Sequence, residues 1–492
     1  MDFQVPAFNL IFISPLLIVI GWGMGLMIVD MFLPQGRKHL IGWLSLVGYV
    51  VALVQTLALW GWERGVFTPA GGTPMIMVDN YSNLLNVVFL LTGAISVLFS
   101  INYLGKAGID RNEFYYLMMF SVSGMMLMGM ANDLILVFLA LELLSIPLYV
   151  LSGFARPRSD SEESAMKYFL LGAFASSFLV FGVALIYGAT GSTALPVVLE
   201  NIGGSGAIGA AGVALLLVGL GFKVAAVPFH MWTPDVYEGA PTAVTAFMSV
   251  GAKVGGFAAM IRIFVYALPD LGDTWVPALA VLAAITMIAG NVIALSQTNI
   301  KRMLGYSSIA HAGYIMMAVA SSIRSENGVS AALFYMVAYL FTNLGAFAVV
   351  IAVERQAGTG VMLSDYKGLA KRSPLMALAL AYFMLSLTGV PPTGGFSGKF
   401  FVFRSVIEAD MIWLVLVGVV TSVISGYFYL RVVYYAFMFE GDDTAEVTSR
   451  PALNMAVALT AVVTLVLGLA PGFVYLLTQD AVVSGVQRLV GG

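Results

Sequence analysis

The sequence predicts an all-α polytopic membrane protein with about fourteen transmembrane helices. Of the 492 residues, 60% are hydrophobic and 10% are charged, whereas soluble domains carry about 25% charged residues. A chain of this composition cannot cover its surface with polar groups, so it needs lipid as its solvent. In lipid only helices and closed barrels satisfy the backbone. The apolar runs are about 20 residues long, which matches helices rather than barrel strands.

Composition also limits the chemistry of the chain. There are no cysteines, which excludes disulfides and iron-sulfur ligation by thiolates. The three histidines, His39, His230 and His311, are too scattered for a haem or zinc site. We therefore expect no cofactor or metal in this chain. The N-terminus shows no basic region followed by a small-residue cleavage site, so no removable signal peptide is expected.

Apolar windows place the individual spans, with boundaries good to a few residues. In chain order they lie near residues 10–33, 41–62, 80–103, 114–130, 133–154, 165–190, 207–230, 241–267, 275–297, 304–322, 330–353, 374–407, 411–438 and 453–478.

The basic residues orient these spans. With the N-terminus outside, the odd-numbered loops are cytoplasmic and hold Arg37, Lys38, Lys106, Arg111, Arg156, Arg158, Lys167, Lys301, Arg302, Arg355, Lys367, Lys371, Arg372 and Arg450. The opposite loops hold only Arg64 and Arg324, and the C-terminal tail adds Arg488. This positive-inside bias predicts that both termini lie outside.

Two of the spans are interrupted. In the seventh, Pro228 has no N–H and clashes with the carbonyl of Val224, directly beside Lys223. The twelfth contains a Pro-Pro pair (391–392) and several glycines just before Lys399. Interrupted spans at matching places in two halves indicate an inverted-repeat transporter.

Residue spacing is compatible with such a repeat. The pairs Glu142/His311, Lys223/Lys399 and Lys253/Arg431 are separated by 169 (311 − 142), 176 (399 − 223) and 178 (431 − 253) residues. Because the offset is five spans, an odd number, the second copy would be inverted. The drift in spacing shows that the paired residues need not be strict equivalents.

Glu142 is the one acidic residue in the middle of a span. A charge at the bilayer centre is costly and normally has a partner. We interpret Glu142 as a carboxylate that pairs with a lysine, foremost Lys223, and changes protonation. The alternative is a fixed structural ion pair between helices.

Three lysines also lie inside spans: Lys223, Lys253 and Lys399. Burial disfavours the charged form of a lysine, which lets it exchange protons near neutral pH. The alternative for each is snorkelling to the membrane interface. Lys253 lies about 12 residues into its span, too deep for comfortable snorkelling.

Three arginines fall inside spans as well. For Arg262 and Arg404, near span ends, snorkelling or a helix-end role is the favoured interpretation, and for Arg431 both roles stay open. Arginine is always protonated, so it can position a charge but cannot relay a proton.

Two histidines are further relay candidates. His311 could pass protons, since a histidine titrates near neutral pH, or it could be a satisfied core residue. His230, at the end of the seventh span, could lie at a proton entrance. The alternative for His230 is interfacial anchoring beside Trp232 and Tyr237.

One motif matches a nucleotide-binding pattern without the structural context that the pattern requires. Residues 204–209 fit G-x-G-x-x-G, but they lie where a loop enters a span and not between a strand and a helix, so dinucleotide binding is excluded. The basic loop residues flank spans and form no stripe, so no nucleic-acid partner is expected.

Four long segments resemble the antiporter-like membrane subunits of respiratory complex I, and most of all the subunit N type of bacterial NADH-quinone oxidoreductase. They are LALELLSIPLYVLSGF (139–154), GFKVAAVPFHMWTPDVYEGAPTAVTAFMSVGAKVGGF (221–257), IKRMLGYSSIAHAGY (300–314) and LTGVPPTGGFSGKFFVF (387–403). The resemblance covers nearly the whole chain.

The resemblance implies fourteen helices, with helices 4–8 and 9–13 as inverted repeats and breaks in helices 7 and 12. Its proton-relay residues fall on Glu142, Lys223, Lys253 and Lys399. The implied organisation is an N-terminal unit (1–110), a first repeat (111–270), a second repeat (271–440) and a C-terminal helix (441–492).

The resemblance also implies a proton-translocating subunit in the bacterial inner membrane, beside M-type and K-type neighbours. FMN and iron-sulfur clusters would lie in partner subunits, and quinone would be the substrate of the complex. The alternatives are a subunit of a cation/proton antiporter or of a membrane-bound hydrogenase, and a purely structural scaffold.

Overall fold

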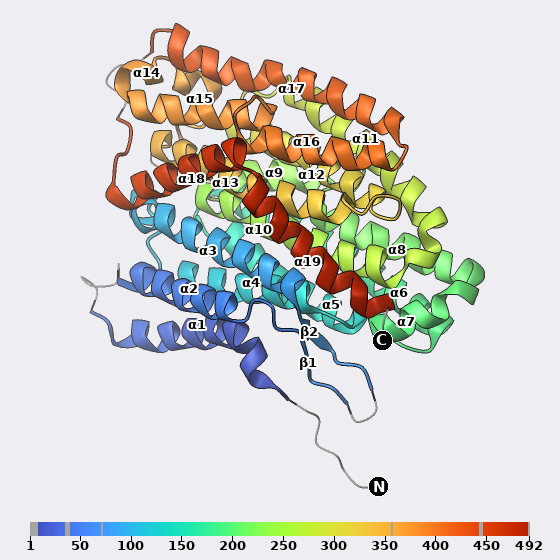
Figure 1. The fold of residues 1–492 in the computed structure, drawn as a ribbon. Coiled ribbons are helices and arrows are strands. Elements are labelled where there is room, and N and C mark those ends of the chain that lie inside the picture. The colour runs from blue at the N-terminus through green and yellow to red at the C-terminus, as the bar shows by residue number, and fades with distance from the viewer. Residues whose placement is uncertain (1–7, 35–39, 70–71, 356–357, 442–445, 491–492) are drawn as a thin grey trace.

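The computed structural model describes residues 8–34, 40–69, 72–355, 358–441 and 446–490, with side chains to residue 482. His39 lies outside the described residues. The fold is a stack of long, roughly parallel helices (Figure 1). In the part of the chain that is described, one short antiparallel hairpin pairs β1 (Arg64–Val66) with β2 (Ile76–Val78).

The helices of the first half are α1 (Ser14–Phe32), α2 (Leu40–Ala58), α3 (Asn80–Lys106), α4 (Glu113–Met130), α5 (Leu134–Ser152), α6 (Ser159–Thr190), α7 (Leu195–Asn201), α8 (Gly206–Val224), α9 (Trp232–Gly239) and α10 (Thr242–Met260). Those of the second half are α11 (Gly272–Ala294), α12 (Ile300–Ser321), α13 (Gly328–Val353), α14 (Leu369–Arg372), α15 (Pro374–Thr388), α16 (Gly394–Glu408), α17 (Ile412–Met438), α18 (Pro451–Leu469) and α19 (Gly472–Val490).

Twelve helical segments of the described chain are long and apolar enough to cross a membrane. This confirms the prediction of an all-α polytopic membrane protein. The apolar window of the segment that begins with α10 is 100% buried, and those of α12 and α13 are 94% buried, against 33% for α17. The centre of the fold is therefore α10, α12 and α13, and helices such as α17 present apolar side chains to lipid.

Both predicted interruptions coincide with helix ends. Helix α8 ends at Val224, and Ala225 takes a left-handed conformation with φ of 63°. Helix α15 ends at Thr388, and Gly389 takes a left-handed conformation with φ of 92°. Helix α16 then begins after Thr393, whose hydroxyl accepts a hydrogen bond from the N–H of Phe396. Each break leaves main-chain carbonyls of a helix end without intrahelical partners.

Two predicted spans differ from the structure. The predicted span 207–230 stops at Val224, because the chain turns before Pro228. The predicted span 453–478 is wrong as a single helix, since α18 ends at Leu469 and Pro471 separates it from α19. Proline cannot supply the N–H that would continue α18. Helix α19 crosses obliquely over the other helices in Figure 1 and packs on α3 and α13.

Close packing of α4 on α5 yields a first prediction. A Cβ at Gly124 would lie 2.3 Å from the main-chain nitrogen of Leu144, so Gly124→Ala must push the two helices apart. Such overpacking costs about 1–3 kcal/mol. The thermal unfolding midpoint, followed by intrinsic fluorescence, should fall. Gly21→Ala is the control, because no atom lies within 4 Å of that position. Equal midpoints for the two variants would contradict the packing argument.

Candidate functional site: buried lysines beside two helix breaks

Lys223 is buried one residue before the end of α8, with 2% exposure. Its ammonium donates hydrogen bonds to the hydroxyls of Ser145, at 2.7 Å, and Tyr168, at 3.2 Å. The ring of Tyr168 stacks on Trp232 at 4.5 Å between centroids. Snorkelling is therefore the wrong interpretation of Lys223, whose charge is held inside the protein by neutral oxygens.

Glu142 lies one turn before Ser145 on α5. One of its carboxylate oxygens accepts a hydrogen bond of 2.5 Å from Ser176 on α6. Among the described residues, Glu142 forms no direct ion pair with Lys223. A cavity of about 10 Å³ lies between Ser145, Ser176 and Lys223, which is about the volume of one water. Lys223 thus lines this cavity, and Glu142 is linked to it only through Ser176, so the two predicted partners do not contact each other directly.

Lys253 is also buried, with 3% exposure, in the middle of α10. Its ammonium donates a hydrogen bond of 2.5 Å to the main-chain carbonyl of Ser308, and the Ser308 hydroxyl accepts one from Tyr339 at 2.9 Å. One turn further along α10, a Cβ at Gly256 would lie 3.3 Å from Cγ of Lys223. Helix α10 thus contacts the stem of Lys223 and carries Lys253 toward α12.

His311 lies on α12 among tyrosines. Its Nδ1 is 2.6 Å from the hydroxyl of Tyr335, and its Nε2 is 3.1 Å from that of Tyr429. The Tyr429 hydroxyl also bonds to Ser307. A neutral imidazole can donate from one nitrogen and accept at the other, so the geometry satisfies His311 and at the same time connects it to a polar chain. Both interpretations of His311 are compatible with these contacts.

Lys399 follows the second helix break, and its exposure is 4%. The ammonium donates to the carbonyls of Leu387, at 3.1 Å, and Thr388, at 2.7 Å, and to the hydroxyl of Ser422, at 2.8 Å. These carbonyls are the ones that α15 leaves free where it ends. The negative end of a helix dipole favours a cation at this place.

A second cavity of about 10 Å³ reaches from the histidine to the end of α15, since it is lined by His311, Tyr335, Tyr339 and Leu387. The polar groups therefore follow one another from Lys253 through Ser308 and the tyrosines around His311 to the carbonyls that hold Lys399. Lys223 and its partners are connected to this row by α10, which contacts the side chain of Lys223 at Gly256 and carries Lys253.

His230 lies apart from this row, in the turn between α8 and α9. The side chain is half buried, and burial lowers the pKa of His230, although a hydrogen bond with the Pro228 backbone opposes the shift. The interfacial interpretation is wrong for its neighbours, since Trp232 and Tyr237 are fully buried at 1% and 0% exposure.

The three intramembrane arginines have structural partners. Arg262 is buried and forms an ion pair of 2.9 Å with Asp79, so the snorkelling interpretation is wrong for it. Arg404 is half exposed and pairs with Glu408 on the same helix. Arg431 donates to the carbonyls of Leu295 and Gln297 beyond the end of α11.

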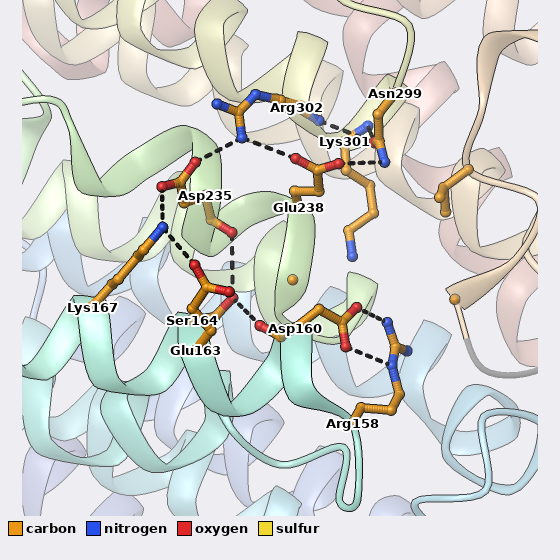
Figure 2. Close-up of a pocket in the computed structure, with 13 residues that line it drawn as sticks. Arg158, Asp160, Glu163, Ser164, Lys167, Asp235, Glu238, Asn299, Lys301 and Arg302 are labelled. Carbon is orange, nitrogen blue, oxygen red and sulfur yellow. Dashed lines mark hydrogen bonds and ion pairs between the residues drawn. The ribbon is translucent and has the colours of Figure 1, made fainter.

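A cavity of about 340 Å³ lined by charged residues opens between the beginnings of α6 and α12 and the short helix α9 (Figure 2). Arg302 bridges Asp235 at 2.7 Å and Glu238 at 2.9 Å, while Lys167 contacts Asp235 at 2.6 Å. Burial acts to raise the pKa of Asp235, but its hydrogen bonds to Lys167 and Arg302 outweigh burial and hold that pKa below the ordinary value. Positive-inside topology places this cavity on the predicted cytoplasmic side.

Comparisons with known proteins agree with this geometry. A profile of the family described as "NADH:quinone oxidoreductase/Mrp antiporter, TM" matches residues 131–425. The NADH-quinone oxidoreductase subunit N of Chloroflexus aggregans is 48% identical over 97% of this chain and 98% of its own length. The chain belongs to this family. The resemblance inferred from the sequence is thereby confirmed.

Solved structures extend the match to three dimensions. A chain of respiratory complex I from Thermus thermophilus with bound aureothin has 36% identity and a TM-score of 0.80, covering 94% of this chain and 98% of that one. A chain of the Mrp complex from Dietzia sp. DQ12-45-1b has a TM-score of 0.86, covering 98% of this chain and 100% of that one. Its identity is 23%, so it shares the fold alone.

Sequence reasoning missed most of the residues that contact the three buried lysines. Ser145 could have been found, since it lies one turn from Glu142 on an otherwise apolar helix. Tyr335 and Tyr339 are one turn apart on α13 and together face His311. A tyrosine in an apolar span looks like packing, however, and only the fold brings Tyr168 to Lys223.

The buried Arg262–Asp79 pair yields a second prediction. Asp79→Asn removes the charge that balances a buried guanidinium, which costs about 3–5 kcal/mol. We expect a marked drop in the thermal unfolding midpoint and in the amount of protein recovered from membranes. Glu440→Gln, which breaks the exposed Lys371–Glu440 pair, should change neither by much. A stable Asp79→Asn variant would show that Arg262 needs no counter-charge.

Proposed function

We propose that this chain is the N-type, proton-translocating membrane subunit of a bacterial NADH-quinone oxidoreductase, respiratory complex I. The observation that carries the proposal is the row of three buried lysines, Lys223, Lys253 and Lys399, each held by neutral oxygens. A buried ammonium without a carboxylate partner is poised to lose its proton. The names of full-length relatives such as that of Chloroflexus aggregans support the same assignment.

In this proposal protons move along the row by changes of charge at its members. Lys223 is the central switch, because its hydroxyl partners can accept from an ammonium or donate to an amine. Glu142 biases that switch from beside the cavity, through Ser176. Lys253 connects the two halves, and Lys399 is the terminal group, while His311 and His230 are secondary relay candidates.

The finer architecture belongs to the proposal too. Adding α4 and the broken pair α15–α16 to the twelve long spans gives fourteen (12 + 1 + 1). The repeats would comprise residues 111–270 and 271–440, with 1–110 and 441–492 as flanking units. The breaks after Val224 and Thr388 would be equivalent positions of the two copies.

The proposal also assigns partners. Electron transfer from NADH through FMN and iron-sulfur clusters to quinone would take place in other subunits, since this chain has no cysteine. M-type and K-type membrane subunits would flank it in the bacterial inner membrane. The apolar faces exposed on helices such as α1 and α17 suit lipid or such neighbours.

A second candidate is a subunit of a cation/proton antiporter, because the Dietzia Mrp chain has the same fold. The two candidates differ in their redox partners. A native gel of mildly solubilised membranes, stained for NADH dehydrogenase activity and assayed for flavin and iron, separates them. We expect NADH dehydrogenase activity, flavin and iron in the band that contains this chain. A band without flavin or iron would favour the antiporter.

Neutralising the central lysine is the third prediction. In reconstituted complex, Lys223→Ala should reduce NADH-driven proton pumping at least about tenfold, since relay groups contribute 10²–10⁴-fold in comparable proton transfers. Oxidation of NADH by ferricyanide should persist, because that reaction uses other subunits. Lys371→Ala, at an exposed lysine, is the control. Normal pumping by Lys223→Ala would support the scaffold interpretation instead.

A further inference from the structure

Glu354, which the relay above does not use, is a buried carboxylate at the end of α13. Its exposure is 1%. One oxygen accepts a hydrogen bond of 3.3 Å from the hydroxyl of Tyr103, and the other has no hydrogen-bond partner. Burial raises the pKa of Glu354, which the positive charges of Lys301 and Arg158 offset only in part. A raised pKa makes it easier for the carboxyl group to take up a proton.

Glu354 and Lys301 are both linked by hydrogen bonds to the turn formed by residues 240–242. Lys301 bonds to it directly, and Glu354 is linked to it through Tyr103. Lys301 donates a hydrogen bond of 2.6 Å to the carbonyl of Ala240, and two residues later the N–H of Thr242 donates to the Tyr103 hydroxyl at 3.0 Å. Tyr103 in turn donates to Glu354. Among the described residues the two side chains form no direct ion pair within 4.0 Å.

Lys301 also faces the charged cavity. It lines that cavity together with Arg158 and Glu238, and in Figure 2 its side chain extends between them. Its exposure is only 2%, so Lys301 forms the inner wall of the cavity. Glu354 does not line the cavity itself but is linked to its wall through Tyr103 and the turn that holds Lys301.

Two buried polar atoms that lie near each other at this place have no hydrogen-bond partner. They are Oε2 of Glu354 and the hydroxyl of Tyr366. Unpaired polar atoms are rare in protein interiors, and each needs an explanation. The two atoms leave this carboxyl group open to a change of hydrogen-bond partner.

A polar face of α10 leads from this turn to Lys253. It carries Thr242, Thr245 and Ser249, all fully buried, and the Ser249 hydroxyl accepts a hydrogen bond of 2.6 Å from Asn343 on α13. Thr242 and Lys253 are 11 residues apart (253 − 242) on one face of the helix, a distance of about 16 Å.

We infer that Glu354 is a proton-exchanging residue that connects the charged cytoplasmic cavity to Lys253. This inference rests on the proposed function. The carboxylate takes a proton from water in the cavity and becomes a neutral acid. It then releases that proton toward the uncharged amine of Lys253, along the hydroxyls of α10 and intervening water, which restores the carboxylate and yields an ammonium. Lys301 stabilises the carboxylate between cycles.

A structural role is the competing explanation, since a carboxylate at the N-terminus of α10 also suits the helix dipole. Glu354→Gln separates the two roles. The amide keeps an oxygen for the Tyr103 hydroxyl but cannot exchange a proton. In reconstituted complex we expect normal assembly and NADH–ferricyanide activity, with NADH-driven pumping reduced at least about tenfold. Glu354→Asp, which keeps the acid, should pump faster than Glu354→Gln.

Pumping at the wild-type rate by Glu354→Gln would overturn the inference, and so would equal losses in the Gln and Asp variants. Glu440→Gln, an exposed carboxylate in a predicted cytoplasmic loop, controls for loss of surface charge. The variant Lys253→Ala shows whether a negative result refutes only the inference about Glu354 or the proposed proton-translocating function as a whole. If Lys253→Ala stops pumping and Glu354→Gln does not, only the route through Glu354 is wrong. If both variants pump normally, the relay itself is wrong.

Discussion

The cost of placing a lysine ammonium inside a membrane protein governs the rest of this structure. Each of Lys223, Lys253 and Lys399 is buried, and each ammonium contacts hydroxyl or carbonyl oxygens rather than a carboxylate. Neutral oxygens compensate a buried charge only in part, because they lack the full Coulombic attraction of a counter-ion. The charged and uncharged forms of each lysine are therefore closer in free energy than they would be in an ion pair. Arg262, which keeps its charge, has a carboxylate partner instead.

Helix breaks provide the oxygens that these lysines need. Continuous helices consume their own carbonyls, so an intact α15–α16 helix would offer nothing to Lys399. Because α15 stops at Thr388, its last carbonyls turn to the ammonium. At the first break the chain turns after Val224 and brings Trp232 under Tyr168, which orients the hydroxyl toward Lys223. The most buried helices, α10, α12 and α13, hold the groups between the breaks, which places the polar row as far from lipid as the fold allows.

The sequence predicted the parts of this arrangement that depend on composition and on single residues. Apolar windows located the spans, and the prolines at 228 and 391–392 predicted where two of them break, because proline has a local effect on the backbone. A lysine inside a span is conspicuous for the same reason. The residues that contact each lysine could not be predicted. Ser308, Tyr339 and Tyr429 reach their partners through packing between distant helices. Glu354 falls just outside the predicted span 330–353, and only the fold shows that it is buried.

The most direct test of this account is a measurement of lysine protonation during turnover. Reconstituted complex with ¹⁵N-labelled lysine would be studied by infrared difference spectroscopy between the resting state and steady NADH oxidation. The account predicts ammonium bands that shift with the isotope, change during turnover and lose intensity in Lys399→Gln. Label-sensitive bands that stay constant while protons are pumped would contradict it, because the buried lysines would then keep one charge state throughout the cycle.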